Sequence, residues 1–301
     1  MKVDPEKLIE LFRVEPGTKC KLKDHDPAWA GTDEMKELGK DELKERAQNY
    51  LRSNLQELTA AQELLYASDT YSLLIILQAM DAAGKDGVIK HVMSGVNPQG
   101  CQVHSFKKPS DEELDHNFLW RCMKSLPERG RIGIFNRSYY EEVLVVKVHP
   151  ELLERQRLPP GKRGDAFWEG RYDDINRFER HLNRNGTKLL KLFLHVSRKE
   201  QKRRFLERLN QPDKAWKFSA ADSAERRYWS DYMDAYETAL SATSTKWAPW
   251  YVVPADHKWV TRTLIAYLIT SSIKSLGLEY PQPTAEQFQA MEQAKAALLE
   301  E

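Results

Sequence analysis

The stretch Ser72-Leu-Leu-Ile-Ile-Leu-Gln-Ala-Met-Asp-Ala-Ala-Gly-Lys-Asp-Gly87 begins as a continuous apolar run and ends in a glycine-containing turn. The first half is typical of a strand buried on both faces, and the second half resembles the phosphate-binding loop G-x-x-x-x-G-K-[ST]. Two positions differ from that loop, because Ala79 replaces the first glycine and Asp86 replaces the magnesium-binding hydroxyl residue. The stretch therefore predicts a strand, a loop and a helix that together handle phosphate.

The predicted loop offers backbone N–H groups and a single lysine, Lys85, to a phosphate. In such loops the N–H groups and the dipole of the following helix hold phosphate oxygens, while the ammonium group stabilises negative charge during transfer. A carboxylate at this place repels an anion unless a cation lies between them, so we interpret Asp81 as a Mg²⁺ ligand. The residues assigned to phosphate binding are Ala82, Ala83, Gly84, Lys85 and Gly87. The alternatives are a tight turn with an exposed lysine, and for Asp86 a first-turn position that favours the helix dipole.

The composition is that of an ordinary globular protein. Its 301 residues are 41% hydrophobic, which is enough for a sizeable core. Lys and Arg number 46 against 45 Asp and Glu, so a polyanion would have to bind a local cluster of cations. Three cysteines without metal-type spacing favour free thiols. The charged first residues and the lack of a long apolar run lead us to expect neither secretion nor membrane insertion. We therefore expect a cytoplasmic protein.

Apolar runs and helical patterns alternate along the chain. The predicted strands are 72–78, 101–106, 131–135, 188–196 and 250–253, and the main predicted helices are 34–67, 85–94, 111–125 and 171–184. This alternation predicts right-handed crossovers and an α/β fold of three layers, with a mostly parallel central sheet of about five strands. We expect an N-terminal extension with a long helix at 1–67, a core domain at 68–282 and a helical tail at 283–301.

Asn136-Arg-Ser-Tyr-Tyr-Glu141 follows the third predicted strand, which places its polar residues at the carboxyl edge of the sheet, where α/β folds bind ligands. Asn136 stands where an aspartate usually binds metal and is a weaker, neutral ligand, whereas Arg137 offers phosphate a planar fork of donors. Glu141 or Glu142 is available to restore the negative charge. The alternative is that Asn136 and Ser138 only cap the next helix.

A basic segment follows the fourth predicted strand. Between residues 198 and 218, eight Lys and Arg residues stand against three Asp and Glu residues. Arg204 and Arg208 are four residues apart and share one face of the predicted helix. A charged run alone is typical of a solvated surface, but behind a phosphate loop it predicts a lid at about 198–230 that excludes water and adds positive charge. Lys214 and Lys217 suit a long phosphate chain.

Five motifs together resemble the polyphosphate kinase 2 family, from about residue 30 to residue 282. They are Ala79-Met-Asp-Ala-Ala-Gly-Lys-Asp-Gly87, Gly95-Val-Asn-Pro98, Leu119-Trp-Arg121, Phe135-Asn-Arg-Ser-Tyr-Tyr-Glu141 and Ala248-Pro-Trp-Tyr-Val-Val-Pro-Ala-Asp256, in this order. The Ala79-Met-Asp opening and the Asn136-Arg-Ser run resemble the class III branch, whose members phosphorylate both nucleoside monophosphates and nucleoside diphosphates.

The resemblance implies a phosphate-loop kinase fold like that of thymidylate kinase, with a helical lid. It implies inorganic polyphosphate as phosphoryl donor, AMP and ADP as acceptors that yield ADP and ATP, other nucleotides as further substrates, and Mg²⁺ or Mn²⁺ as cofactor. Catalytic roles are implied for Asp81, Lys85, Arg137 and Arg204, and substrate binding for Lys90, Asn97, Arg121, Asn136, Arg208, Lys214 and Lys217. We also expect a homo-oligomer, a dimer or a tetramer, that binds neither membrane nor nucleic acid.

Two rival functions fit parts of the sequence. One is an ATP-dependent nucleoside monophosphate kinase on the same fold, although its loop would more often keep a hydroxyl residue after the lysine. The other is a non-enzymatic binder of polyanions or RNA that uses the basic segment with Trp216 and Phe218. Direct in-line transfer needs no strong general base, because the attacking phosphate oxygen is already ionised at neutral pH. We therefore interpret His91, His104 and His195 as structural or surface residues.

Overall fold

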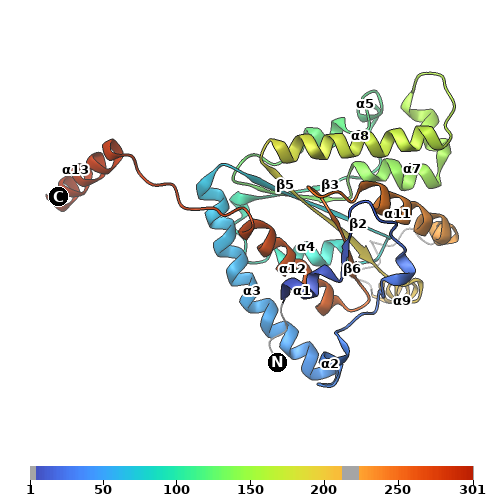
Figure 1. The fold of residues 1–301 in the computed structure, drawn as a ribbon, viewed down its shortest axis with the longest axis horizontal. Helices are drawn as coiled ribbons and strands as arrows, with labels where there is room; N and C mark the ends of the chain where they lie inside the picture. The colour runs from blue at the N-terminus through green and yellow to red at the C-terminus, as the bar shows by residue number, and fades with distance from the viewer. Residues whose placement is uncertain (1–4, 212–223, 301) are drawn as a thin grey trace.

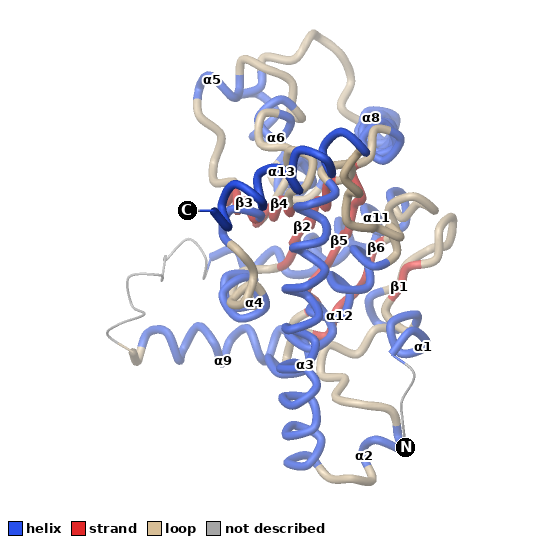
Figure 2. The backbone as a smooth tube through the Cα atoms, turned by 90° about the vertical axis from the view of Figure 1, so that its left-hand side faces the viewer, coloured by secondary structure: helices blue, strands red, loops and turns tan. Residues whose placement is uncertain are grey.

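A six-stranded sheet in the order β1-β6-β5-β2-β4-β3 forms the centre of the computed structural model, which describes residues 5–211 and 224–300 (Figures 1 and 2). The strands are β1 Arg13–Val14, β2 Ser72–Ala79, β3 Cys101–Ser105, β4 Ile132–Asn136, β5 Thr187–His195 and β6 Trp250–Pro254. Strands β2 to β6 are parallel to their neighbours, and β1 pairs antiparallel with β6. The predicted α/β fold with a mostly parallel sheet is confirmed, and β1 is an additional edge strand.

Helices cover both faces of the sheet and give three layers (Figure 1). One face carries α3 (Lys40–Ser68), α4 (Lys85–Val92) and α12 (Lys258–Lys274), and the other carries α8 (Asp165–Arg184) and α11 (Trp229–Thr243). The shorter helices are α1 Pro5–Glu10, α2 Asp33–Lys36, α5 Asp111–Leu114, α6 Trp120–Met123, α7 Val145–Val148 and α9 Arg198–Leu209. The 3-10 helices are η1 Leu22–Asp24, η2 Pro98–Gly100, η3 Tyr139–Val143, η4 Pro150–Gln156 and η6 Arg226–Tyr228.

The core explains why the apolar run of β2 lacks alternation. All eight residues of β2 are buried, because the strand lies between β4 and β5 and beneath helices on both faces. The long helix α3 packs along α12, and its Leu58 and Leu65 are completely buried. The predicted helix at 34–67 is confirmed from Lys40 onward. Before it, α2 is a separate short helix, because Gly39 has a φ of +81° and interrupts the helical path.

The predicted helix at 111–125 is wrong as a single element. Its start is as expected, since the Ser110 side chain accepts a hydrogen bond from the Glu113 N–H in a capping box. The helix ends after one turn, and a second short helix, α6, follows. Between them the Asn117 carboxamide oxygen accepts a hydrogen bond from the Leu119 N–H at 3.0 Å. Such a local side-chain bond competes with helical hydrogen bonding and ends α5 early.

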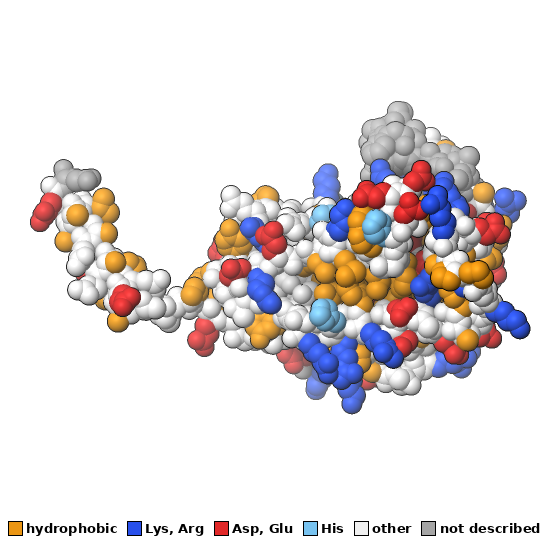
Figure 3. Space-filling view, turned by 90° about the horizontal axis from the view of Figure 1, so that it is seen from above, with side chains coloured by type: hydrophobic (Ala, Val, Ile, Leu, Met, Phe, Trp, Pro, Cys, Tyr) orange, Lys and Arg blue, Asp and Glu red, His pale blue; other side chains and the backbone are white. Residues whose placement is uncertain are grey.

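The two ends of the described chain differ in how they join the core. The N-terminal extension contributes β1 to the central sheet, so the division at 67/68 remains a proposal. At the other end, α13 (Ala285–Glu300) stands away from the core at the end of an extended connection (Figures 1 and 3). Every residue from 279 to 300 is exposed. Within 5–211 and 224–300, no helix is long and apolar enough to cross a lipid bilayer.

Candidate active site

A pocket of about 750 Å³ lies at the carboxyl edge of the sheet. Its walls are the loops that follow β2, β3 and β4, together with α9 and the first turns of α12. Among the described residues that line it, eight are Lys or Arg and three are Asp or Glu. The protein as a whole has a net charge of only +1, so positive charge is concentrated in this pocket. The pocket is therefore suited to an anionic ligand.

The loop between β2 and α4 forms the floor of the pocket and has the conformation of a phosphate-binding turn. Ala82 and Gly84 have positive φ values of +61° and +113°. The Lys85 side chain is buried at the start of α4, and its Nζ donates a hydrogen bond to the Ala79 carbonyl oxygen at 3.0 Å. Burial, and then the Arg137 guanidinium, lower the pKa of Lys85, while Asp81 opposes this shift. The predicted residues Ala82, Ala83, Gly84, Lys85 and Gly87 all line the pocket.

Arg137 is held between two carboxylates beside this loop. Its Nη2 donates to Asp81 Oδ1 at 2.8 Å, and its Nη1 lies 3.5 Å from Glu141 Oε2. Burial raises the pKa of Glu141, although the neighbouring Arg137 acts in the opposite direction. The Arg137 backbone has a φ of +66°, in the left-handed region that is unfavourable for a residue with a side chain. The fold thus brings together Asp81, Lys85 and Arg137, as the sequence predicted.

The oxygen donors in the pocket fit a magnesium ion only in part. Within the described ranges, no group of three or more His, Cys, Asp or Glu residues could hold a metal by itself. Mg²⁺ in phosphoryl-transfer sites is usually bound by one or two carboxylates, substrate phosphates and water. Asp81 lines the pocket and fits such a site, whereas Glu141 is absent from the lining and pairs with Arg137. Asn136 also lines the pocket, and its Nδ2 donates to Asp86 Oδ1 at 3.0 Å.

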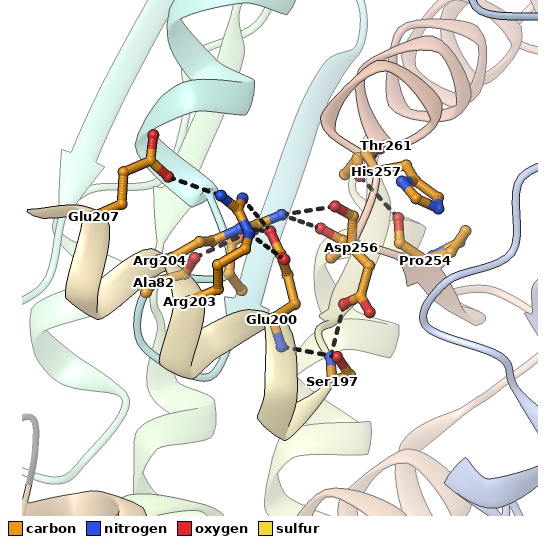
Figure 4. Close-up of polar contacts among 12 residues, drawn as sticks. Ala82, Ser197, Glu200, Arg203, Arg204, Glu207, Pro254, Asp256, His257 and Thr261 are labelled. Atoms are coloured by element: carbon orange, nitrogen blue, oxygen red, sulfur yellow. Dashed lines mark hydrogen bonds and ion pairs between the residues drawn. The ribbon is translucent and has the colours of Figure 1, made fainter. Parts of the chain in front are cut away.

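Arg204 lies on α9, in the segment predicted to be a lid, but its guanidinium is engaged by acceptors of the protein itself. Its side chain is only 5% exposed, and all five guanidinium N–H groups are donated to acceptors of the protein (Figure 4). The acceptors are the carbonyl oxygens of Ala82, Ala83, Ala255 and Asp256, at 2.6 to 3.1 Å, and Glu200 Oε1 at 2.7 Å. Arg204 lines the pocket, but in this arrangement it joins α9 to the phosphate loop and to the loop after β6. We therefore propose that it positions the loop.

The charged residues around Arg204 make contacts within α9 and between the start of α9 and the loop after β6. Glu200 accepts hydrogen bonds from Arg203 and Arg204, and the bond from Arg203 is the main reason that the pKa of Glu200 falls to about 2. Asp256 Oδ1 accepts a hydrogen bond from the Ser197 N–H at 2.8 Å, just before α9 begins (Figure 4). These contacts fix the first turns of α9 against the core.

The remaining predicted residues lie at different distances from the pocket. Arg208 lines it, on the same face of α9 as Arg204. Lys90 and Asn97 are exposed and are not part of the lining, and the Asn97 side chain caps η2. Arg121 lies behind the wall, where it donates to the Lys107 carbonyl oxygen at 2.7 Å. Lys214 and Lys217 lie outside the described residues.

Four cations of the lining were not predicted from the sequence. Lys107 and Lys108 follow β3, and Lys258 and Arg262 lie in the first turns of α12. Asp86 was not predicted as a site residue either, because its place in the first turn of a helix offered another explanation, but it lines the pocket. A usable signal was present, since in a parallel sheet the residues after every strand meet at the same edge. That rule applied to β3 would have selected Lys107 and Lys108, whereas Lys258 and Arg262 lie within α12, beyond the loop that follows β6.

The loop conformation, its position at the edge of a parallel sheet and the excess of cations are those of the phosphate-loop kinases. Within that class, the family model described as Polyphosphate kinase 2 (PPK2) matches residues 41–279. The chain therefore belongs to the polyphosphate kinase 2 family.

Characterised relatives and solved structures agree with this assignment. An ADP-polyphosphate phosphotransferase of Rhodopseudomonas palustris is 52% identical, over 96% of this chain and 97% of that protein. An AMP/ADP-polyphosphate phosphotransferase of Meiothermus ruber is 42% identical, over 91% of this chain and 96% of that protein. The crystal structure of polyphosphate kinase 2 from Arthrobacter aurescens TC1 superimposes with a TM-score of 0.82, at 38% identity and over 96% and 97% of the two chains.

Proposed function

We propose that this chain transfers the terminal phosphoryl group of inorganic polyphosphate to ADP and AMP, forming ATP and ADP. The observation that carries the proposal is the pocket lining, in which eight cations surround a phosphate loop against three anions. A polymer of phosphates needs more positive charge than one nucleotide, and cations beyond the loop supply it. The relatives from Rhodopseudomonas palustris and Meiothermus ruber carry names that describe this chemistry.

The proposed reaction is a direct in-line displacement. A terminal phosphate oxygen of the acceptor attacks the terminal phosphorus of polyphosphate, forming a new P–O bond. The P–O bond to the penultimate phosphate breaks, and its electron pair leaves with the shortened polyphosphate as an ionised phosphate oxygen. Lys85 and the N–H groups of its loop bind the transferring group, and Arg137 stabilises the charge that spreads over its oxygens. No side chain has to accept a proton.

Asp81 is the residue that we propose to hold a divalent cation, Mg²⁺ or Mn²⁺, together with substrate phosphates. When bound, the cation would neutralise phosphate charge next to the loop. Asn136 and Asp86 lie at the end of β4 and the start of α4, and their oxygens complete the polar wall on this side. The role of Arg137 includes keeping Asp81 in place, since the two side chains are joined at 2.8 Å.

The proposal predicts nucleotide formation without any nucleoside triphosphate as donor. We expect purified protein with Mg²⁺ and long-chain polyphosphate to convert AMP to ADP and ADP to ATP, as measured by chromatography of the nucleotides. A parallel reaction with ATP and AMP but no polyphosphate tests the rival nucleoside monophosphate kinase. If only the second reaction proceeds, or if neither does, the proposed function is wrong.

We propose further that the polyphosphate chain extends from the loop between α4 and α12. Lys258 and Arg262 line the pocket from α12, and α4 packs against this helix. The pKa of His91 on α4 is lowered, first by burial and then by Arg262, Lys90 and Lys258. The charges of Lys90, Lys258 and Arg262 are therefore all near enough to His91 to affect its pKa. Lys90 lies outside the pocket lining, and we propose that it binds phosphates of the chain beyond the pocket.

A double variant tests this path. We expect Lys258→Met with Arg262→Met to raise KM for polyphosphate by about 100-fold or more, because two bonds to charged phosphates are lost and each is worth roughly 1.5–3 kcal/mol. The KM for ADP should change little. The matched control is Lys274→Met at the far end of α12, where the lysine pairs with Glu57. An equal rise in KM for polyphosphate and for ADP would contradict the proposal that Lys258 and Arg262 bind polyphosphate and not the acceptor.

We also propose a cytoplasmic location and a homo-oligomer. Cys20, Cys101 and Cys122 are free thiols. Burial raises the pKa of Cys20 and of Cys122 to about 12 and that of Cys101 to about 11, so all three stay protonated at neutral pH. Free thiols support a reducing compartment.

A further inference from the structure

A buried ion pair joins β5 to α8 in the core. Lys191 Nζ lies 2.6 Å from Glu179 Oε2, and neither side chain has any exposed surface. The same ammonium group donates to Tyr140 Oη at 3.0 Å and to the Thr243 carbonyl oxygen at 2.6 Å, so its three N–H groups all have acceptors. The other carboxylate oxygen, Glu179 Oε1, accepts from the hydroxyls of Tyr139 at 2.9 Å and Tyr140 at 2.8 Å. We call Lys191, Glu179, Tyr139 and Tyr140 the tyrosine anchor.

The two tyrosines belong to the segment that carries Arg137. They are the second and third residues after it, and Glu141 follows them directly. A left-handed backbone like that of Arg137 persists only where the surroundings over-determine it. On the strand side, the Arg137 N–H is bonded to the Leu77 carbonyl oxygen at 3.0 Å. On the other side, the tyrosine anchor holds the chain.

Stability alone is a poor reason for this arrangement. A buried ion pair loses the hydration of both charges, and replacing it with apolar side chains of similar volume is often neutral or stabilising. Burial lowers the pKa of Lys191, and only its contact with Glu179 acts in the other direction. Such a network does, however, select one arrangement of its members, because every donor and acceptor has a fixed partner. None of the four residues of the anchor belongs to the pocket lining.

We infer that Glu179 and Lys191 are positioning residues that act through the hydroxyls of Tyr139 and Tyr140 to hold Arg137 over the phosphate loop. The inference rests on the proposed function, because it takes Arg137 as the group that stabilises the transferring phosphoryl. Glu141 follows Tyr140 directly, so the anchor also sets the second carboxylate beside Arg137. Displacement of this segment would move the guanidinium away from Asp81 and from the loop.

The test removes only the hydroxyls. We expect Tyr139→Phe with Tyr140→Phe to lower kcat for ADP phosphorylation by about 10- to 100-fold, with little change in either KM, because small displacements of a catalytic group have effects of this size. The matched control is Tyr172→Phe, which removes another buried hydroxyl from the core, bonded to Lys147 Nζ at 3.0 Å. A second variant, Glu179→Gln with Lys191→Met, removes both charges together and should give the same loss of kcat in a folded protein.

A double-mutant cycle with Arg137→Ala shows whether the effect passes through Arg137. In that background the two Tyr→Phe changes should have almost no further effect on kcat. The inference is overturned if the effects multiply fully, or if the tyrosine variant keeps the kcat of Tyr172→Phe.

A measurement without turnover separates this inference from the proposed function. The Nε–Hε NMR signal of Arg137, assigned by its loss in Arg137→Lys, should report a more mobile side chain in the tyrosine variant and not in Tyr172→Phe. An unchanged signal contradicts the inference even if the enzyme is active. An unmodified chain without transfer from polyphosphate, but with the expected NMR change, would overturn only the proposed function.

Discussion

Lys85→Met is expected to lower kcat for transfer from polyphosphate by about 10²- to 10³-fold, the usual effect of removing one preorganised group that stabilises transition-state charge. Lys85 is buried at the start of α4, and its ammonium group contacts the loop itself at the Ala79 carbonyl oxygen. Methionine has a similar length but carries no charge. The measurement is initial ATP formation from ADP at saturating polyphosphate.

The control for Lys85 is a lysine whose charge lies outside the site. Lys44 is exposed on α3 and does not line the pocket, so Lys44→Met should leave kcat unchanged. A Lys85→Met protein with full turnover and a raised KM for polyphosphate alone would show that Lys85 only binds the donor. The transition-state role would then be wrong.

The pH dependence gives an independent check on Lys85. Its pKa is lowered, first by burial and then by Arg137, so it loses its proton at a lower pH than an ordinary lysine. Because the protonated form is the active one, kcat/KM should fall as the pH rises through this lowered pKa, and activity should be complete below it. In the same assay, the kcat/KM of Lys85→Met should not show this fall at high pH.

Strong local signals made most of the sheet predictable. Five strands were predicted close to their observed bounds. Strands β2, β4, β5 and β6 are largely buried and form apolar runs separated by turn residues, whereas β3 is a partly exposed edge strand. Strand β1 was missed for a physical reason. It has two residues, Arg13 and Val14, and their extended conformation is set by pairing with Tyr251 and Trp250 far along the chain. No periodicity can develop over two residues.

The site was predictable only where it follows a strand with a recognisable motif. Asp81, Lys85 and Arg137 met as expected, because parallel strands bring their carboxyl ends to one edge. Lys258 and Arg262 were missed because their place depends on α12 lying beside α4, which is a matter of tertiary packing. A helical pattern predicts which residues share a face but gives no information about the partner of that face.

Arg204 is the clearest example of a residue whose partners depend on tertiary packing. Its substitution is also the second change for which we expect a large loss of activity. We expect Arg204→Lys and Arg204→Ala to lower kcat to a similar extent, about 100-fold, because a preorganised loop would lose its support. Lysine keeps the charge, but three N–H groups cannot replace five donors in a planar fork. Unfolding should also require less free energy, by about 3 kcal/mol, since each buried carbonyl left without a donor costs roughly 1–3 kcal/mol. Steady-state kinetics and thermal denaturation of both variants measure these effects.

The neighbouring arginine provides the control. Arg203 is exposed, and its bonds among residues 5–211 and 224–300 stay within α9, to Glu200 and Glu207, so Arg203→Lys should keep both stability and turnover. The comparison of lysine with alanine at Arg204 then separates two roles. A group that contacts the transferring phosphoryl acts largely by charge, so lysine would restore much of the rate that alanine loses. A group that holds four carbonyl oxygens of two loops acts by geometry, and lysine would restore little. The buried position and the five engaged donors favour the second result.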